Sequence, residues 1–404
     1  MLIGIVGKPS VGKSTFFKAA TLSEVDIANY PFTTIKPNHA VGFVKILDAA
    51  QEKQFGKVSN PRMGYVQDKW RFVPVDLIDV AGLVPDAHKG EGMGGQFLND
   101  LNQADALVHV IDASGSVNAR GEPVEPGSYD PANDIKFLEI ELDYWYLDIL
   151  KKGWEKLARQ AQQEKKEIFK AIYQQMSGVG VSEESARSAV KNAELETVAV
   201  KDWSEEQLLK LASALREQTK PMVIAANKCD HPIGKENLAK LKEQFPNYII
   251  IATSAESELA LREADKKELI KYVPGSQDFN ITEKGKEKLS EQQQKGLEFI
   301  KEKVLKGYDE GTGIQAVLNK VVFELLHRKA IHPGGVGKLE DSNGNTLPDC
   351  FIMKEDATAL DFAYQLHTDF GDNFVKAIDV RTRLPVGKDH ILKHLDIIEI
   401  MSSK

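Results

Sequence analysis

The sequence predicts an α/β protein in which a doubly wound, mostly parallel sheet is interrupted by helical insertions and followed by a small separate α+β domain. Three observations support this fold class. Short apolar runs alternate with helical stretches, and more than a hundred residues separate the run that ends at Ile111 from the one that begins at Met222. Finally, Pro333-Gly334-Gly335 precedes a segment with short strands and frequent turn signals.

The apolar runs have the length and composition of buried parallel strands. They cover residues 2–6, 72–78, 106–111, 222–226 and 248–252, and the more alternating segment 39–46 suits an edge strand. Helical stretches separate several of them, as in a doubly wound sheet. We therefore expect a discontinuous α/β domain formed by residues 1–115 and 218–330.

Two insertions are expected within this domain. The first, residues 116–217, contains the proline-free segment 134–176 and a second helical segment, 183–217, joined by a glycine-containing turn. This pattern predicts two long antiparallel helices, a coiled-coil arm. The second insertion, residues 257–311, is charged and mostly helical, with a break at Pro274-Gly275, and the amphipathic segment 313–327 closes the α/β domain. The small C-terminal domain is expected at 333–404, with one helix near 357–367.

Composition excludes several classes of protein. The chain has 404 residues, a formal net charge of −8 and two cysteines. It is therefore neither uniformly basic, as a general nucleic-acid coat would be, nor a disulfide framework. The apolar start of the chain is short and lacks a basic leader, and no apolar run is long enough to cross a bilayer. We expect a cytoplasmic monomer with no membrane partner.

A phosphate-binding loop follows the first predicted strand. The stretch Gly7-Lys8-Pro9-Ser10-Val11-Gly12-Lys13-Ser14 matches G-x-x-x-x-G-K-[ST] in full and leads into a plausible helix that begins near Thr15. Its backbone N–H groups would cradle phosphates, Lys13 would neutralise the β and γ oxygens, and Ser14 would bind Mg²⁺. The alternative is a glycine turn that merely links a strand to a helix.

A base-reading loop follows the fourth predicted strand of the parallel set. In Asn227-Lys228-Cys229-Asp230, the carboxylate of Asp230 suits the two donors on one edge of guanine, which adenine lacks. Lys228 would lie over the base and Asn227 would brace the loops. After the next strand, the stretch Thr253-Ser254-Ala255 offers a backbone N–H to guanine O6, so Ser254 and Ala255 complete the predicted guanine site. The tetrapeptide alone is also typical of an ordinary turn, but its order after a P-loop and a D-x-x-G stretch is specific.

With these motifs in place, the chain resembles the Obg family of translation-associated GTPases, closest to its YchF branch. The resemblance rests on GKPSVGKSTFF, NYPFTTIKPN, DVAGLV, GEGMGGQFL and NKCD, and the stretches ALDFAYQLHTDF, KAIDVRT and VGKDHIL resemble a TGS domain of β-grasp type. It implies a P-loop GTPase domain, a coiled-coil insertion and a C-terminal TGS domain. It also implies slow Mg²⁺-dependent GTP hydrolysis, with GTP and GDP as ligands and the ribosome or ribosomal RNA as partner.

The same resemblance assigns roles to the switch residues. Thr34, in preference to its neighbour Thr33, would bind Mg²⁺ when the γ-phosphate is present. Asp79 would hold Mg²⁺ through water, and the N–H of Gly82 would meet the γ-phosphate. Two alternatives remain at this stage: an ATPase of the YchF type, against which Asp230 argues, and a nucleotide-sensing module with little turnover.

The residue that would orient the attacking water is unusual. Ras-like GTPases have a glutamine after the glycine of D-x-x-G, whereas this chain has Leu83, which neither donates nor accepts a hydrogen bond. Within the same loop, His88 is the best candidate, because a neutral imidazole accepts a hydrogen bond from water. The competing interpretations are a loop histidine without a role, a partner-supplied group and assistance by the substrate phosphate.

The segment 151–170 has seven basic and three acidic residues, with interleaved aromatic residues. One interpretation is contact with RNA phosphates, and the other is a solvated arm whose aromatic residues pack on a partner helix. The C-terminal segment 333–404 has eight basic and twelve acidic residues. It is a poor electrostatic partner for RNA unless its basic residues cluster on one face.

Overall fold

The computed structural model describes residues 1–21, 38–80, 100–163 and 167–403. These residues form two compact units. The first is built mainly from Met1–Ala19 and Asp76–Val317, and the second mainly from Val41–Val75 and Leu318–Lys404. Within the described residues, no helix is both long and apolar enough to cross a membrane.

The main sheet has the strand order β2-β4-β1-β5-β6-β7, with β3 paired to β4. Its strands are β1 (Leu2–Val6), β2 (His39–Leu47), β3 (Tyr65–Gln67), β4 (Trp70–Asp79), β5 (Ala106–Asp112), β6 (Met222–Asn227) and β7 (Ile249–Ala252). The pairs β1/β4, β1/β5, β5/β6 and β6/β7 are all parallel. The predicted doubly wound sheet and the positions of its strands are therefore confirmed.

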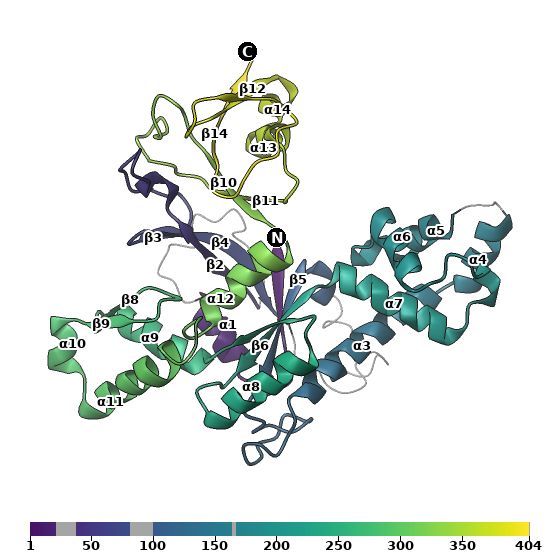
Figure 1. Ribbon diagram of the computed structural model, residues 1–404, viewed down its shortest axis with the longest axis horizontal. Helices are drawn as coiled ribbons and strands as arrows, with labels where there is room; N and C mark the ends of the chain where they lie inside the picture. Colours follow the sequence, from purple (N-terminus) through teal and green to yellow (C-terminus); the bar gives the residue numbers. More distant parts are fainter. Residues whose placement is uncertain (22–37, 81–99, 164–166, 404) are drawn as a thin grey trace. The chain divides into compact units, whose positions relative to one another are not determined.

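The centre of the sheet is buried on both faces. Every residue of β5 and β6 is buried, as expected for strands that read as continuous apolar runs. In the first unit, α1 (Lys13–Thr21) follows β1, and α8 (Pro232–Gln244) follows β6 and packs on β6 and β7 (Figure 1). Because β1, β4, β5 and β6 are parallel, their carboxyl ends lie at the same edge of the sheet, where the loops of the predicted site begin.

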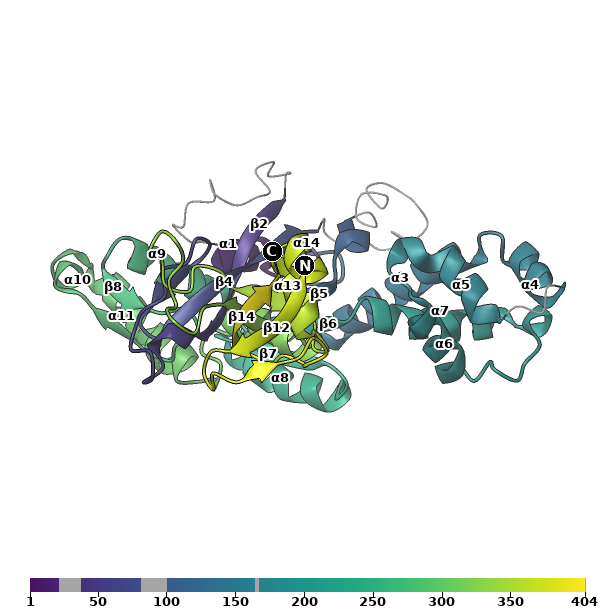
Figure 2. The same cartoon turned by 90° about the horizontal axis from the view of Figure 1, so that it is seen from above.

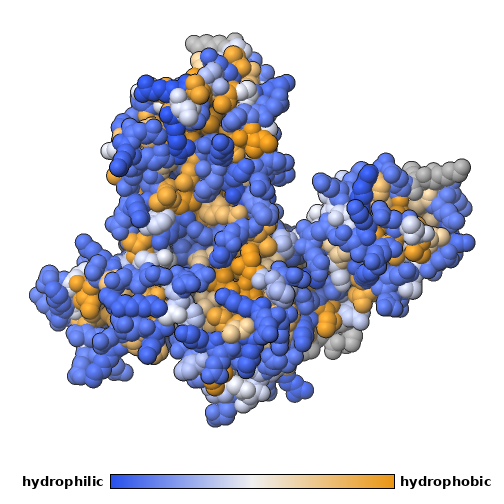
Figure 3. All heavy atoms as spheres, viewed as in Figure 1, coloured by the Kyte–Doolittle hydropathy of each residue, from blue (hydrophilic) through white to orange (hydrophobic). Residues whose placement is uncertain are grey.

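The first insertion consists of shorter helices than predicted. It contains α3 (Ala132–Lys151), α4 (Trp154–Gln163), α5 (Ile168–Met176), α6 (Glu183–Asn192) and α7 (Glu205–Thr219) (Figure 2). The glycine turn lies where it was predicted, at Gly180, but the expectation of two long helices was wrong. Gly153, at φ +79°, ends α3 within the first predicted helix, and Glu194, at φ +60°, follows the end of α6 within the second. Ser182 starts α6 with a capping box at the predicted position, and Ser204 starts the additional helix α7 in the same way. Figure 3 shows a group of apolar residues on the visible face of this arm, with hydrophilic residues around it.

The second insertion also contains an element that the sequence did not predict. After α9 (Ala255–Lys266), the strands β8 (Ile270–Tyr272) and β9 (Phe279–Ile281) form an antiparallel hairpin around Pro274-Gly275. The helices α10 (Glu283–Lys288) and α11 (Glu291–Phe299) and the π-helical turn η6 (Ile300–Leu305) follow. The hairpin strands are only three residues long, too short for a periodic signal.

The closing helix and the C-terminal sheet belong to the second unit, apart from the start of α12. The predicted helix at 313–327 is α12 (Ile314–Asn319), which continues into the π-helical turn η7 (Lys320–Leu325). The sheet has the order β11-β10-β14-β12-β13 and carries α13 (Ala359–Leu366) and α14 (Thr368–Asp372). Its strands are β10 (Lys329–Pro333), β11 (Phe351–Met353), β12 (Phe374–Asp379), β13 (Pro385–Val386) and β14 (Ile397–Ser402). Because β10 begins at Lys329, the sheet starts a few residues before the predicted boundary at 333.

The segment between β2 and β4 also belongs to this second unit, which the sequence did not indicate. The buried guanidinium of Arg71 donates to the carbonyl oxygens of Leu347, at 2.5 Å, and Pro348, at 3.1 Å. Ala49 and Ala50 pack in one apolar cluster with residues of the C-terminal segment, including Leu347 and, from β14, Ile397. Residues 41–75, predicted as part of the N-terminal domain, therefore belong to the same compact unit as the C-terminal domain, although their strands pair in the main sheet.

Candidate functional site

The predicted phosphate loop forms a turn between β1 and α1, with Gly12 at φ +92°. A Cβ on Gly12 would lie 2.3 Å from Nδ2 of Asn227, so the close approach of these two segments requires glycine. The same Nδ2 donates to the carbonyl oxygen of Val11 at 2.9 Å. The base-reading loop is therefore hydrogen-bonded to the phosphate loop. The turn comprises the predicted residues Gly7, Lys8, Pro9, Ser10, Val11 and Gly12, and the predicted residues Lys13, Ser14 and Thr15 begin α1.

Lys13 and Asp79 form an ion pair at the mouth of this loop. They meet because β1 and β4 are parallel neighbours in which Ile5 lies beside Asp79, so both strands end at the same edge. The contact with the Lys13 ammonium group shows that the Asp79 carboxylate is accessible to a cation. Mg²⁺ is usually bound by one or two protein oxygens together with phosphate and water oxygens. The Ser14 hydroxyl, next to Lys13, and the Asp79 carboxylate fit that role.

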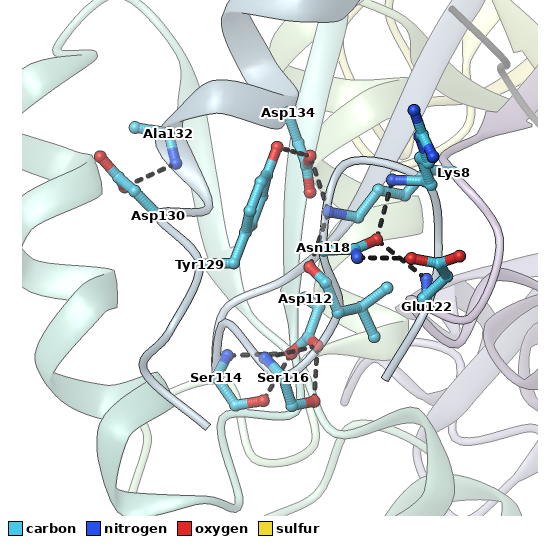
Figure 4. A network of polar contacts seen from close by, with 12 residues as sticks. Lys8, Asp112, Ser114, Ser116, Asn118, Glu122, Tyr129, Asp130, Ala132 and Asp134 are labelled. Carbon is cyan, nitrogen blue, oxygen red and sulfur yellow. Dashed lines mark hydrogen bonds and ion pairs between the residues drawn. The ribbon is translucent and has the colours of Figure 1, made fainter. Parts of the chain in front are cut away.

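Lys8 is the centre of a buried polar network (Figure 4). Only 5% of this residue is exposed, and its Nζ donates to Asp134 Oδ1 at 2.9 Å and to the Val117 carbonyl oxygen at 3.0 Å. Asp134 Oδ1 also accepts from the Tyr129 hydroxyl at 2.8 Å, and Lys8 Nζ lies 3.8 Å from the centre of the Tyr129 ring. Burial raises the pKa of Asp134, and the hydrogen bond from Lys8 offsets this only in part. The network joins the phosphate loop to the first turn of the helical arm.

We expect Asp134→Asn to destabilise the protein, because it leaves the Lys8 ammonium buried without its charged partner. Breaking a buried ion pair costs about 3–5 kcal/mol. The measurement is the thermal unfolding temperature, with Asp148→Asn on the exposed side of α3 as the control. In the double variant Lys8→Met/Asp134→Asn, part of the lost stability should return. A melting temperature for Asp134→Asn equal to that of Asp148→Asn would contradict the prediction.

Asn227 joins the base-reading loop to two other segments. Besides the bond to the phosphate loop, its Oδ1 accepts from the backbone N–H of Ala255 at 3.0 Å and from the Thr253 hydroxyl at 3.5 Å. Asn227 is the last residue of β6 and is 3% exposed, so its amide cannot exchange these partners for water at no cost. This buried amide therefore holds the phosphate loop and the loop after β7 together.

Lys228 is held by a carboxylate at the end of β5. Its Nζ lies 3.0 Å from Asp112 Oδ2 and 3.2 Å from the Ser116 hydroxyl. Asp112 also accepts from the backbone N–H groups and hydroxyls of Ser114 and Ser116. Burial alone would raise the pKa of Asp112, but the hydrogen bonds from Ser114, Ser116 and Lys228 together lower it. The lysine predicted to cover the base is thus positioned by a charged carboxylate.

The guanine-reading carboxylate lies at the same edge. Asp230 Oδ1 accepts from the Ser254 hydroxyl at 2.8 Å, and a carboxylate has about four lone-pair sites, so acceptor capacity remains. The backbone N–H of Ser254 donates to Thr312, and that of Ala255 donates to Asn227. Both N–H groups therefore already have protein acceptors, and a bond to guanine O6 requires Ala255 to share or exchange its partner.

Asp112, Tyr129 and Asp134 were missed by the sequence analysis. Asp112 had a usable signal, because it directly follows an apolar strand whose end lies beside the phosphate loop. Asp134 and Tyr129 had none, since nothing in their local sequence indicates that Lys8 lies against them. Four predicted residues fall outside the described residues: Thr34 with its neighbour Thr33, Gly82 and His88.

Family models match three parts of the chain. Residues 2–136 match the 50S ribosome-binding GTPase model, residues 225–334 match the Obg-like GTPase YGR210-like, G4 motif-containing domain, and residues 343–402 match the TGS domain. The second of these covers the base-reading loop, and the third covers most of the C-terminal sheet.

Curated proteins and solved structures of similar sequence extend over the whole chain. An uncharacterised GTP-binding protein of Methanocaldococcus jannaschii is 47% identical and covers 100% of this chain and 99% of its own length. The ribosome-binding ATPase YchF of Bacillus subtilis is 33% identical over 69% of this chain and 72% of its own length. The crystal structure of a GTP-binding protein from Pyrococcus horikoshii is 37% identical, covers both chains fully and has a TM-score of 0.77. The YchF GTPase of Schizosaccharomyces pombe, 20% identical over 99% of this chain and 97% of its own, shares the fold with a TM-score of 0.60.

Proposed function

The chain belongs to the Obg-like family of P-loop GTPases, in its YchF-like branch with a C-terminal TGS domain, and we propose that it is a GTP-specific regulatory switch. It binds GTP and GDP, hydrolyses GTP slowly with Mg²⁺, and acts as a cytoplasmic monomer on the ribosome or ribosomal RNA. Members of this family are nucleotide hydrolases, so the proposal concerns the choice of nucleotide and the partner.

The observation that carries the choice of guanine is the position of Asp230. Its carboxylate accepts a hydrogen bond from the Ser254 hydroxyl. Asp230 is in the same loop as Asn227, whose buried amide donates to the phosphate loop. A carboxylate at this place pairs with the two N–H donors of guanine, and adenine offers no such pair. The GTP-binding relative at 47% identity is also more similar to this chain than the curated ATPase at 33%. A YchF-type ATPase remains the rival function, because relatives with that name are in the same family.

Mg²⁺ would be held by Ser14 and Asp79, with Thr34 joining them when a γ-phosphate is present. The ion would neutralise the phosphate oxygens. Lys13 binds the β and γ oxygens as a point charge, and the N–H of Gly82 meets the γ-phosphate. The assignments of Thr34 and Gly82 follow the family pattern, and the Lys13–Asp79 ion pair supports the role of Asp79.

Calorimetric titration of the nucleotide-free protein tests the choice of nucleotide. We expect GTP and GDP to bind at least a hundredfold more tightly than ATP and ADP, which corresponds to about 3 kcal/mol. Equal affinities for GTP and ATP would overturn the GTP assignment and favour the rival ATPase. Measurable binding with no hydrolysis, alone or with ribosomes, would instead favour a nucleotide-sensing module.

Cosedimentation with ribosomes tests the partner. The protein should sediment with ribosomes in a non-hydrolysable GTP analogue and be released in GDP, or the reverse, because a switch needs different affinities in its two states. Equal cosedimentation in both nucleotides would contradict a switch acting on ribosomes. The proposal is motivated by the 50S ribosome-binding GTPase model that matches residues 2–136 and by the name of the YchF relative.

The helical arm contributes less to RNA contact than its composition suggested. Trp154 and Phe169 are 9% and 7% exposed, and Trp154 stacks on Trp203 with ring centres 5.3 Å apart. Lys151 and Arg159 form ion pairs with Glu205 and Glu155. The two aromatic residues pack inside the arm and two of its cations are neutralised, so we favour the solvated arm over an RNA-binding face.

We propose that His88 orients the attacking water, since Leu83 has no polar group. Under single-turnover conditions with saturating GTP, His88→Ala should hydrolyse GTP at least about tenfold more slowly with unchanged GTP affinity, within the range of general-base effects. His39→Ala, a substitution at the start of β2, is the control. A wild-type rate for His88→Ala, alone and with ribosomes, would exclude His88 and leave a partner-supplied group or the substrate phosphate.

A further inference from the structure

The second unit contains a small cavity that the nucleotide site does not use. Its volume is about 240 Å³, and it is formed where three segments of this unit meet: the loop between β2 and β3, the glycine-rich loop after β10 and the turn between β12 and β13. Its polar and aromatic lining includes Phe55, Lys57, Lys338, Arg381 and Arg383. No single stretch of sequence contains more than two of these residues.

The charged side chains that line this cavity are all basic, although carboxylates lie next to two of them. Four basic side chains line it, and none of its lining residues is acidic. Four carboxylates contact this lining from behind: Glu52 and Asp396 at Arg381, Glu340 at Lys57, and Glu399 at the Val336 N–H. Phosphate groups are the anions for which arginine and lysine are the usual protein partners.

Two of the four cations are already paired, and two are available. Lys57 pairs with Glu340, and Arg381 binds Glu52 with both Nε and Nη2. Lys338 and Arg383 are exposed, and their side chains make no hydrogen bond or ion pair with any residue that the structure describes. Lys57 and Arg381 are therefore fixed in the walls of the cavity, whereas Lys338 and Arg383 have unused hydrogen-bond donors at its rim.

The floor of the cavity is apolar. Phe55 and Val336 pack against a buried cluster that includes Leu339 and Val380, and Phe55 itself is only partly buried. At the rim, a Cβ on Gly337 would meet no atom within 4 Å, so that side is open. An aromatic ring beside free cations is the combination with which proteins hold an unpaired base next to its phosphate.

We propose that this cavity binds one unpaired nucleotide of a single-stranded RNA, with the base against Phe55 and the flanking phosphates on Lys338 and Arg383. The volume of about 240 Å³ is below the roughly 300–1,000 Å³ typical of pockets that enclose a free small molecule, but it suits one nucleotide of a longer strand. The inference rests on the proposed ribosomal partnership for the source of the RNA. It does not depend on GTP hydrolysis or on the choice of guanine.

The test is the binding of a fluorescent single-stranded RNA heptamer to the full-length protein, measured by anisotropy at several salt concentrations. In Lys338→Glu/Arg383→Glu the affinity should fall at least about tenfold, and the salt slope should decrease by about 1.4, because two phosphate contacts are lost. The control is Lys354→Glu/Lys388→Glu, which reverses two exposed lysines of the same unit away from the cavity. The control should bind the heptamer as the wild type does.

A third variant isolates the contribution of the ring. Phe55→Leu keeps an apolar side chain on the floor but removes the stacking surface, so RNA affinity should fall at least about fivefold, while the protein stays folded with a slightly lower melting temperature. Wild-type RNA affinity in Lys338→Glu/Arg383→Glu, or an equal loss in the control, would overturn the proposal. A mononucleotide that binds as tightly as the heptamer, or an acidic peptide that competes equally well, would also overturn it. GTP affinity, measured on the same variants, should equal that of the wild type. If the wild-type protein itself does not bind GTP, that result counts against the GTPase assignment and not against this cavity.

Discussion

Replacing Asp230 with asparagine should weaken GTP binding about a hundredfold. The carboxylate would make two charge-assisted hydrogen bonds to guanine, and losing this pair costs about 2–3 kcal/mol. The loop itself should remain in place, because the amide oxygen of an asparagine still accepts from the Ser254 hydroxyl that now holds Asp230 at 2.8 Å. We therefore expect Asp230→Asn to lower the affinity for GTP without lowering the stability of the fold.

The same variant should gain affinity for xanthine nucleotides. Xanthine has a carbonyl oxygen where guanine has its amino group, and the asparagine amide donates to that oxygen. Calorimetric titrations with GTP, ATP and XTP measure the three affinities, with Asp202→Asn, an exposed site in the arm, as the control. Ser254→Ala should cost only about two- to tenfold, because the Asp230 carboxylate keeps both hydrogen bonds to guanine and loses only the hydroxyl that positions it. Unchanged GTP affinity in Asp230→Asn would contradict the assigned role of this carboxylate.

The parts of the fold that local signals determine were predictable. The strands at the centre of the sheet are continuous apolar runs, and β5 and β6 are buried at every residue, so their positions followed from hydropathy alone. The phosphate and base-reading loops are contiguous motifs that follow such strands. Their meeting at one edge follows from parallel pairing, which makes the strand ends coincide.

The parts that depend on distant contacts were not predictable. Lys228 and Asp112 are 116 residues apart, and Lys8 and Asp134 are 126 apart. Arg71 reaches a carbonyl oxygen 276 residues further along the chain. Asp134 and Arg71 are polar and read as surface residues in their local sequence, and the motifs that contain Lys8 and Lys228 do not indicate their distant partners. The helical arm differs from its prediction for a local reason. Its residues are helical as predicted, but short breaks, such as the one at Gly153, divide it into shorter helices.

The phosphate loop should be equally sensitive to a single added methyl group. In Gly12→Ala the new Cβ would lie 2.3 Å from Asn227 Nδ2, at a φ of +92° that alanine disfavours. The left-handed backbone costs about 1–2 kcal/mol and the overlap about 1–3 kcal/mol. The nucleotide-free loop can relax both by moving, but the bound loop cannot, because its N–H groups must converge on the phosphates.

Most of this cost should therefore appear in binding. We expect Gly12→Ala to lose at least about a hundredfold in affinity for GTP and GDP, as about 3 kcal/mol implies. Because Asn227 also holds Ala255, the clash should disturb the base site and the phosphate site together. Gly153→Ala is the matched control: its φ is +79°, yet a Cβ there meets no atom within 4 Å. Calorimetry should show wild-type GTP affinity for Gly153→Ala, and an affinity of Gly12→Ala within threefold of wild type would mean that the contact with Asn227 does not hold the phosphate loop in its binding conformation.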